Sequence, residues 1–79
     1  MGTIIFEDLG YVPGTGGGYY DPESDEIHID SSRPPDKQME VLIHEVLESE
    51  LYKQFKHTYI DLLTSKIFTA LMELKRRQK

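Results

Sequence analysis

Hydrophobic and polar positions alternate over short runs in the first third of the chain. Residues 3–6 form one β-favouring run, and a later run places Ile27 and Ile29 on one face of a strand. A tight turn is predicted at Pro22, because proline fixes its φ angle and the aspartate before it can bond the turn backbone. The pattern predicts a β-rich part at residues 1–34, with a hairpin whose isoleucines face the helices.

From residue 35 onward, hydrophobic residues recur every three or four positions, which is the spacing of one face of a helix. The first helix is predicted at residues 35–54, because Asp36 follows two prolines and complements the positive end of the helix dipole. Thr58 with Asp61 three residues later resembles a capping box and starts a second helix, predicted at residues 58–77. The stripe predicted to point inward consists of Met39, Ile43, Leu47 and Leu51 in the first helix and Ile60, Leu63, Ile67, Leu71 and Leu74 in the second.

The length of the chain predicts one small domain, residues 1–79, with an α+β fold in which a hairpin or small meander packs on two antiparallel helices. There are no cysteines, so disulfides are excluded and any metal must be held by His, Asp or Glu. No apolar run approaches the ~20 residues of a membrane span, and the first residues lack the basic segment of a secretory signal. The sequence therefore predicts a soluble, cytoplasmic protein without a membrane partner.

Charge is unevenly distributed along the chain, whose formal net charge is −5. Residues 1–50 carry two basic and twelve acidic side chains, whereas residues 51–79 carry seven basic and two acidic ones. The acidic part is a poor surface for nucleic acid, which we do not expect as a partner. The basic cluster at residues 75–79 is typical of a solvated helix end that complements the helix dipole.

A glycine-rich segment, residues 13–18, precedes the predicted hairpin. It lacks the Gly-Lys-Ser/Thr ending of a phosphate-binding loop, and no helix is predicted directly after it. We therefore expect a turn or a mobile lid that tolerates Gly17→Ala with little loss of stability.

Residues 41–50 read VLIHEVLESE, which differs by one residue from the helical zinc motif His-Glu-x-x-His. Residues four apart on a helix are neighbours, so His44 and Glu48 can bind one divalent ion, and the antiparallel return of the second helix makes His57 the natural third ligand. Two histidines and one carboxylate, with a fourth position for water, form many catalytic zinc sites. Glu45, about 100° round the helix from His44, would then accept a proton from that water. The alternative is an ordinary helix with a buried histidine and two solvated carboxylates.

The order of these parts resembles small zincin-like proteins of bacteriophages and prophages. In that family a strand ending in Asp-Ser leads through a proline-started helix into Leu-x-His-Glu-x-x-His or its variant Leu-x-His-Glu-x-x-Glu, and a second helix begins near a histidine. The resemblance covers roughly residues 19–74. It implies a zincin-like fold, zinc or another divalent ion held by His44, Glu48 and His57, and Glu45 as the catalytic carboxylate.

Two functions from different classes follow. The preferred one is a zinc metallopeptidase-like hydrolase, in the cytoplasm of the host if the protein is phage-encoded. The alternative is a catalytically inactive zincin-like scaffold whose acidic face binds a host protein. A peptide or protein is the expected partner in both cases, while the sequence specifies neither the substrate nor the oligomeric state. His28, on the polar face of its strand, is expected to be exposed rather than to bind metal.

Overall fold

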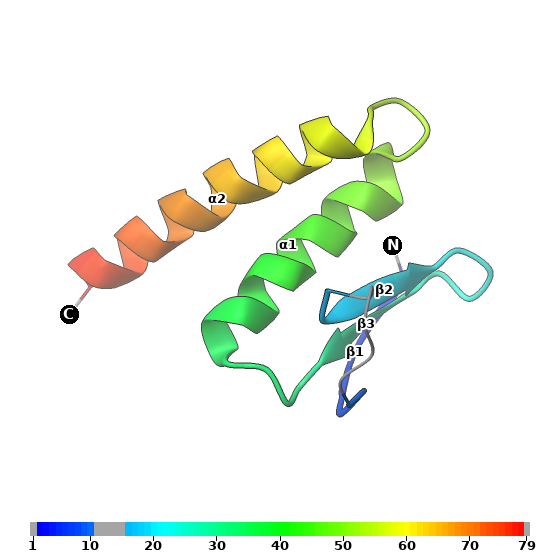
Figure 1. Cartoon of the computed structure of the whole chain (residues 1–79), viewed down its shortest axis with the longest axis horizontal. Helices are drawn as coiled ribbons and strands as arrows, with labels where there is room; N and C mark the ends of the chain where they lie inside the picture. The colour runs from blue at the N-terminus through cyan, green and yellow to red at the C-terminus, as the bar shows by residue number, and fades with distance from the viewer. Residues whose placement is uncertain (1, 11–15, 79) are drawn as a thin grey trace.

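The protein is a three-stranded sheet followed by two helices, which confirms the predicted α+β class (Figure 1). The computed structural model describes residues 2–10 and 16–78. Among these residues, no helix is both long and apolar enough to cross a membrane. The elements are β1 (Thr3–Glu7), β2 (Gly18–Asp21), β3 (Glu26–Asp30), α1 (Pro35–Leu51) and α2 (His57–Arg77).

Strand β3 is the centre of the sheet, whose order is β1-β3-β2. Strands β2 and β3 form the antiparallel hairpin predicted around Pro22. Its turn contains Asp25 at a φ of 55°, and the Tyr20 hydroxyl donates a hydrogen bond of 2.9 Å to the Asp25 carboxylate. Strand β1 pairs with β3 in parallel, a long-range contact that short-range hydrophobic spacing cannot predict. Strand β2 is therefore an edge strand.

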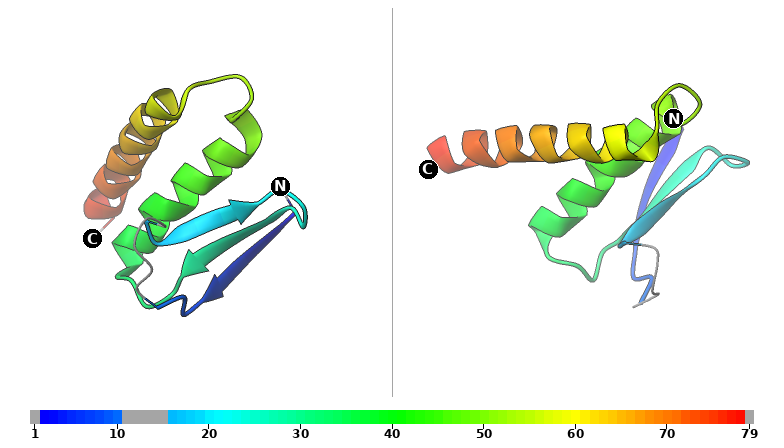
Figure 2. Two further views of the ribbon diagram at one scale, coloured as in Figure 1. Left: turned by 45° about the vertical axis from the view of Figure 1, so that its right-hand side comes forward. Right: turned by 45° about the horizontal axis from the view of Figure 1, so that its top comes forward.

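The three layers of the protein are the sheet, α1 and α2, in that order (Figures 1 and 2). Helix α1 packs on β2 and β3, and α2 contacts α1 but no strand among the described residues. Ile27 and Ile29 of β3 are fully buried against Val41 of α1, as predicted for the isoleucines of the hairpin. The core is small, so α1 holds both other layers in place.

The face of α1 that meets the sheet differs from the predicted one. Val41 and Glu45 are its buried residues, and Leu42 and Val46 pack beside the core. The stripe of α1 that was predicted to point inward, Met39 to Leu51, is only half-buried. Helix α1 lies between the sheet and α2, and the side that it turns to the sheet is not its most hydrophobic arc. Helix α1 also ends at Leu51, three residues earlier than predicted.

The inward face of α2 also differs from the prediction. Ile60 and Thr64 are buried, and the Thr64 hydroxyl donates a hydrogen bond of 2.8 Å to the Ile60 carbonyl. Ile67, Leu71 and Leu74, predicted to point inward, are 38%, 39% and 53% exposed. The reason is that, among the described elements, α2 contacts α1 alone, and one helix covers only part of the hydrophobic arc.

Asp30 at the end of β3 fixes the connection into α1. The Asp30 carboxylate accepts hydrogen bonds from the Ser32 hydroxyl (2.7 Å), the Ser32 amide (3.0 Å) and the Leu9 amide (3.3 Å). Asp30 is 1% exposed. The Ser32 side chain, followed by its backbone amide, lowers the pKa of Asp30 below its usual value. This buried carboxylate orients the chain as it leaves the sheet and thereby places α1 above β3.

Gly17 and Gly18 lie where α1 meets the sheet, and the expected tolerance of Gly17→Ala is wrong. Gly17 has a φ of 102°, and a Cβ atom there would lie 3.2 Å from Val41 Cγ2. A Cβ atom on Gly18 would lie 2.6 Å from the His28 carbonyl oxygen. Residues 13–15 of the glycine-rich segment lie outside the described residues.

Substitution of either glycine is therefore expected to destabilise the protein. Gly17→Ala should cost about 1–3 kcal/mol because alanine resists a positive φ, and Gly18→Ala at least as much because a strand carbonyl must move. Urea unfolding of the two variants checks this. Gly16→Ala is a partial control, because it also has a positive φ but no atom within 4 Å of the added Cβ. Unchanged unfolding of Gly18→Ala would contradict the prediction.

Candidate metal centre

The structure brings together the three predicted ligands at the junction of the two helices. His44 and Glu48 lie one turn apart on α1, and His57 is the first residue of α2. Residues 52–56 reverse the chain, so the start of α2 returns beside the last turns of α1 (Figure 1). One ligand atom from each of the three side chains lies within 4.8 Å of the others.

Glu48 lies between the two imidazole rings. Its Oε2 atom is 3.0 Å from Nε2 of His44, and its Oε1 atom is 3.6 Å from Nδ1 of His57. The rings meet edge to face, with centroids 4.9 Å apart and planes at 72°. His44 and Glu48 are half-buried, whereas His57 is exposed, so the cluster opens to solvent on the α2 side.

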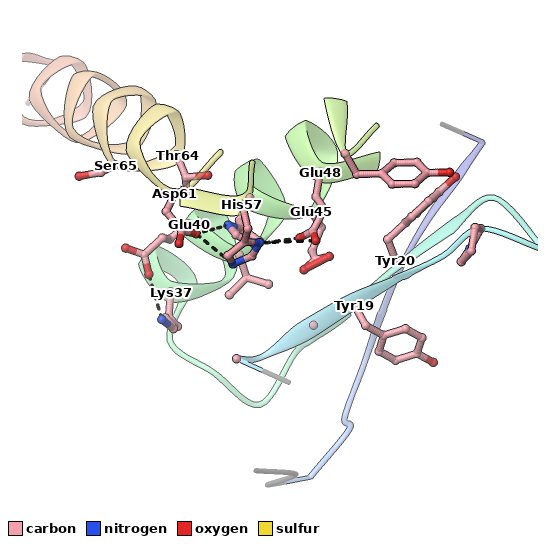
Figure 3. Close-up of a pocket in the computed structure, with 16 residues that line it drawn as sticks. Tyr19, Tyr20, Lys37, Glu40, Glu45, Glu48, His57, Asp61, Thr64 and Ser65 are labelled. Carbon is pink, nitrogen blue, oxygen red and sulfur yellow. Dashed lines mark hydrogen bonds and ion pairs between the residues drawn. The ribbon is translucent and has the colours of Figure 1, made fainter. Parts of the chain in front are cut away.

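Asp61 is a fourth member of the cluster that the sequence prediction assigned to a helix cap. Its Oδ1 atom lies 3.2 Å from Nδ1 of His44 and 3.4 Å from Nε2 of His57 (Figure 3). Asp61 therefore contacts, on each ring, the nitrogen that does not face Glu48. The signal that could have found it is its position four residues after His57, on the same face of α2.

The donor set and its spacing fit a zinc-sized ion. Ligand atoms that are 2.0–2.1 Å from zinc in a tetrahedral site lie roughly 3.4 Å from one another. The two oxygens of Glu48 lie 3.0 Å from His44 and 3.6 Å from His57, and one ligand atom from each of the three side chains lies within 4.8 Å of the others. The nitrogens of the two histidines would have to approach by at most about 1.4 Å, which rotation of the exposed His57 side chain can supply.

Glu45 points from α1 toward the sheet and is the buried carboxylate of this region, with 8% of its surface exposed. Burial raises the pKa of Glu45 above its usual value, and the charge of Glu48 raises it further, while His44 and His57 oppose the shift. Figure 3 shows Glu45 beside Glu48 and near His57. The carboxylate is thus next to the cluster without being one of the three grouped ligands.

A cleft of about 790 Å³ runs over the cluster, between the edge strand β2 and the two helices (Figure 3). Tyr20 of β2 and Tyr52 after α1 line one side of it, and Thr64 and Ser65 of α2 line the other. All three predicted ligands, together with Glu45 and Asp61, line the same cleft.

His28 lies outside the cluster, as predicted, but it is not exposed. Its side chain is 13% exposed because the Tyr19 ring stacks on it, with centroids 4.6 Å apart. Nδ1 is 2.9 Å from Glu7 and Nε2 is 3.2 Å from Glu26. Three strands thus contribute to this contact, since Glu7 is on β1 and Tyr19 on β2.

The contact of His28 with Glu7 and Glu26 predicts that the stability of the protein depends on pH. Hydrogen bonding to Glu7, and more weakly to Glu26, raises the pKa of His28 although burial opposes the shift. The stabilisation is therefore complete below the unfolded-state pKa of about 6.5 and is lost as the pH rises through the higher folded-state pKa. Between about pH 5.5 and 8.5, the urea concentration at the unfolding midpoint should fall more in the parent than in His28→Gln, because only the parent has the His28 contact to lose. The other two histidines are common to both proteins, so their effect on the midpoint cancels in the comparison. Equal losses would contradict this assignment.

Comparison of the chain with protein-family models, curated protein sequences and solved structures finds no match. The resemblance to zincin-like proteins therefore stays a prediction.

Proposed function

We propose that the protein is a metal-dependent, zincin-like hydrolase that acts on peptide bonds. The observation that carries the proposal is the convergence of His44, Glu48 and His57 at one point of an open cleft, with the buried carboxylate of Glu45 beside them. Two imidazoles, one carboxylate and an adjacent free carboxylate are the groups required for metal-assisted hydrolysis.

His44, His57 and Glu48 would hold the ion, and Nε2 of His44 and Nδ1 of His57 both face the carboxylate of Glu48. Asp61 lies beside the opposite nitrogen of each ring, and a hydrogen bond from either nitrogen to its carboxylate would fix the tautomer and orientation of that imidazole. A divalent ion held there would act as a Lewis acid and lower the pKa of a coordinated water.

Glu45 acts as the general base in this proposal. Its position on the sheet side of α1 leaves it out of the ligand set, and burial keeps it away from bulk water. It accepts the proton of the attacking water and returns it to the departing amine. A carboxyl whose pKa is raised by burial is a stronger base for this transfer than an exposed one.

Strand β2 supports a peptide as the substrate. It is an edge strand of the described sheet and borders the cleft through Gly18, Tyr19 and Tyr20, so no other described strand pairs with its outer side, where an added strand could bind. Extended peptides bind to such edges through main-chain hydrogen bonds. With only the four residues Gly18–Asp21, β2 would bind a short segment on either side of the scissile bond.

The test has two measurements on the untagged protein. Elemental analysis should give one zinc per chain for the parent and for the control His28→Gln, because the His28 imidazole is outside the cluster. Calorimetric titration should show that His57→Ala binds zinc at least tenfold more weakly than the parent. Turnover of a peptide library should require the metal. Absence of stoichiometric metal would contradict the site, and metal without turnover would contradict hydrolysis and favour the inactive, protein-binding scaffold.

A further inference from the structure

Three hydrophobic side chains are exposed where the chain passes from α1 into α2. They are Phe55, Tyr59 and Leu62, which are 44%, 43% and 50% exposed. The Phe55 ring stacks on the Tyr59 ring, with centroids 5.0 Å apart, so the connection and the first turns of α2 share one surface. This surface lies at one end of the helical pair (Figures 1 and 2). Exposed hydrophobic side chains grouped in this way indicate an interaction site.

The surface is on the side of α2 that is turned away from α1. Leu62 is two residues from each of the buried Ile60 and Thr64, so it lies about 160° from both round the helix. Tyr59 and Lys66 fall within about 60° of Leu62. Among the described elements α2 contacts α1 alone, and therefore none of them packs on this side.

Lysines surround the three hydrophobic side chains. Lys53 and Lys56 belong to the connection, and Lys66 shares the side of α2 that carries Leu62. All three are exposed. Among residues 2–10 and 16–78, the lysines that pair with a carboxylate are Lys37 and Lys75, so these three ammonium groups have no counter-charge there.

The carboxylates of this part of the chain are engaged elsewhere. Residues 51–60 contain no Asp or Glu. Asp61 lines the cleft beside the histidines, and Glu73 pairs with Arg76 and Arg77. The surface thus combines three unpaired positive charges with three hydrophobic side chains, and its complement is a partner that is both anionic and hydrophobic.

The surface, which we call the tip patch, consists of Lys53, Phe55, Lys56, Tyr59, Leu62 and Lys66. We propose that the tip patch binds the interface of a membrane that contains anionic lipids. The hydrophobic side chains enter the headgroup region, where aromatic rings are favoured, and the lysine ammonium groups contact the lipid phosphates. The inference is independent of the metal centre, because none of the three predicted ligands belongs to the patch.

A lipid interface fits the tip patch better than a polymer chain does. Of the clefts formed by the described residues, neither the one of about 790 Å³ nor the one of about 480 Å³ is lined by a residue of the patch, so neither would hold a peptide against it. The rings of Phe55 and Tyr59 each use one face in their own stacking, whereas single-stranded nucleic acid binds to free ring faces.

Peripheral binding of this kind needs no spanning helix. The expectation of no membrane partner was based on the absence of a hydrophobic segment of that length, which a contact through side chains at the surface does not require. Charges separated by more than about 8 Å are largely screened at physiological ionic strength, so the acidic part of the chain only partly opposes the attraction.

Co-sedimentation of the full chain with lipid vesicles tests the proposal. One set of vesicles is pure phosphatidylcholine, and the other contains roughly one-third phosphatidylserine. We expect the partition coefficient to be on the order of tenfold higher for the anionic vesicles, because each lysine near the surface adds to the attraction. Raising the salt concentration should reduce this difference.

Leu62→Asn tests the hydrophobic part of the contact, with Leu74→Asn as its matched control. Both variants remove an exposed leucine from α2, but Leu74 lies outside the patch, about 120° from Leu62 round the helix. Binding to the anionic vesicles should weaken about fivefold in Leu62→Asn and less than about twofold in Leu74→Asn.

The double variant Lys56→Gln with Lys66→Gln tests the charged part. Its control is Arg76→Gln with Arg77→Gln, which removes the same charge from the other end of α2. Binding should weaken about tenfold in the lysine variant and less than about threefold in the arginine variant. Circular dichroism shows whether each variant folds.

Three results would overturn the proposal. The first is equal binding of the parent to both kinds of vesicle, and the second is a larger loss in the arginine variant than in the lysine variant. The third is binding of a single-stranded oligonucleotide without binding of vesicles, which would assign the patch to nucleic acid.

Discussion

Glu45→Gln is expected to lower peptide turnover by the metal-loaded protein by about a hundredfold or more, which is the usual contribution of a positioned base. Glutamine keeps the size of the side chain but cannot accept the proton of water. The variant should still bind one zinc per chain, because Glu45 is not among the three grouped ligands. It should also fold at least as stably without metal, since burial disfavours the charged carboxylate at neutral pH.

The matched control is Glu50→Gln, which removes a carboxylate from an exposed position of the same helix outside the cleft. Its turnover should equal that of the parent. Initial rates on one peptide, with zinc content measured in the same samples, separate loss of the base from loss of metal. Equal rates in Glu45→Gln and the parent would exclude Glu45 as the base.

Zinc is expected to raise the melting temperature of the parent by ~10 °C or more. A ligand that binds only the folded state adds about 2.7 kcal/mol when it is present at a hundred times its dissociation constant. In a domain of this size, 1 kcal/mol corresponds to roughly 4–8 °C. Melting curves with zinc and with EDTA measure the shift, and His57→Ala should abolish most of it. Identical curves for the parent under the two conditions would contradict the metal site.

The large rise in melting temperature that we expect with zinc follows from the weak packing of α2 on the rest of the protein. The fully or nearly buried hydrophobic residues are Ile27, Ile29, Val41 and Ile60, and only the last of these belongs to α2. Within the part of the chain that the structure describes, α2 therefore packs on α1 and on no strand. An ion bound by His44 and Glu48 of α1 and by His57 of α2 would link the two helices at the N-terminal end of α2.

The parts of the structure that were predicted from sequence depend on local spacing. The hairpin follows from the turn at Pro22 between two β-favouring runs, and the grouping of His44, Glu48 and His57 follows from helical geometry and a short connection. The residue on which α1 ends was predicted three residues too late, because no glycine or proline marks the break after Leu51, whereas α2 ends at Arg77 as predicted.

The orientation of the helices could not be predicted in the same way. Hydrophobic spacing shows that a helix has an apolar side, but not which neighbour covers it or whether any does. Ile67 and Leu71 satisfy the pattern of a buried stripe and are exposed, while the charged Glu45 is buried because α1 turns it toward the sheet. The role of Asp61 likewise depends on how two helices meet, which its own surroundings in the sequence do not specify.

Among the described elements, strand β1 contacts β3 alone and neither helix packs on it, and Phe6 is 54% exposed. Its amides should therefore exchange with solvent through local opening at a lower free energy than those of β3, which is paired on both sides and buried. Such opening would leave α1 and α2 in contact. We therefore expect opening of the N-terminal strand to leave the cluster of His44, Glu48 and His57 together, because β1 contacts neither helix among the described residues.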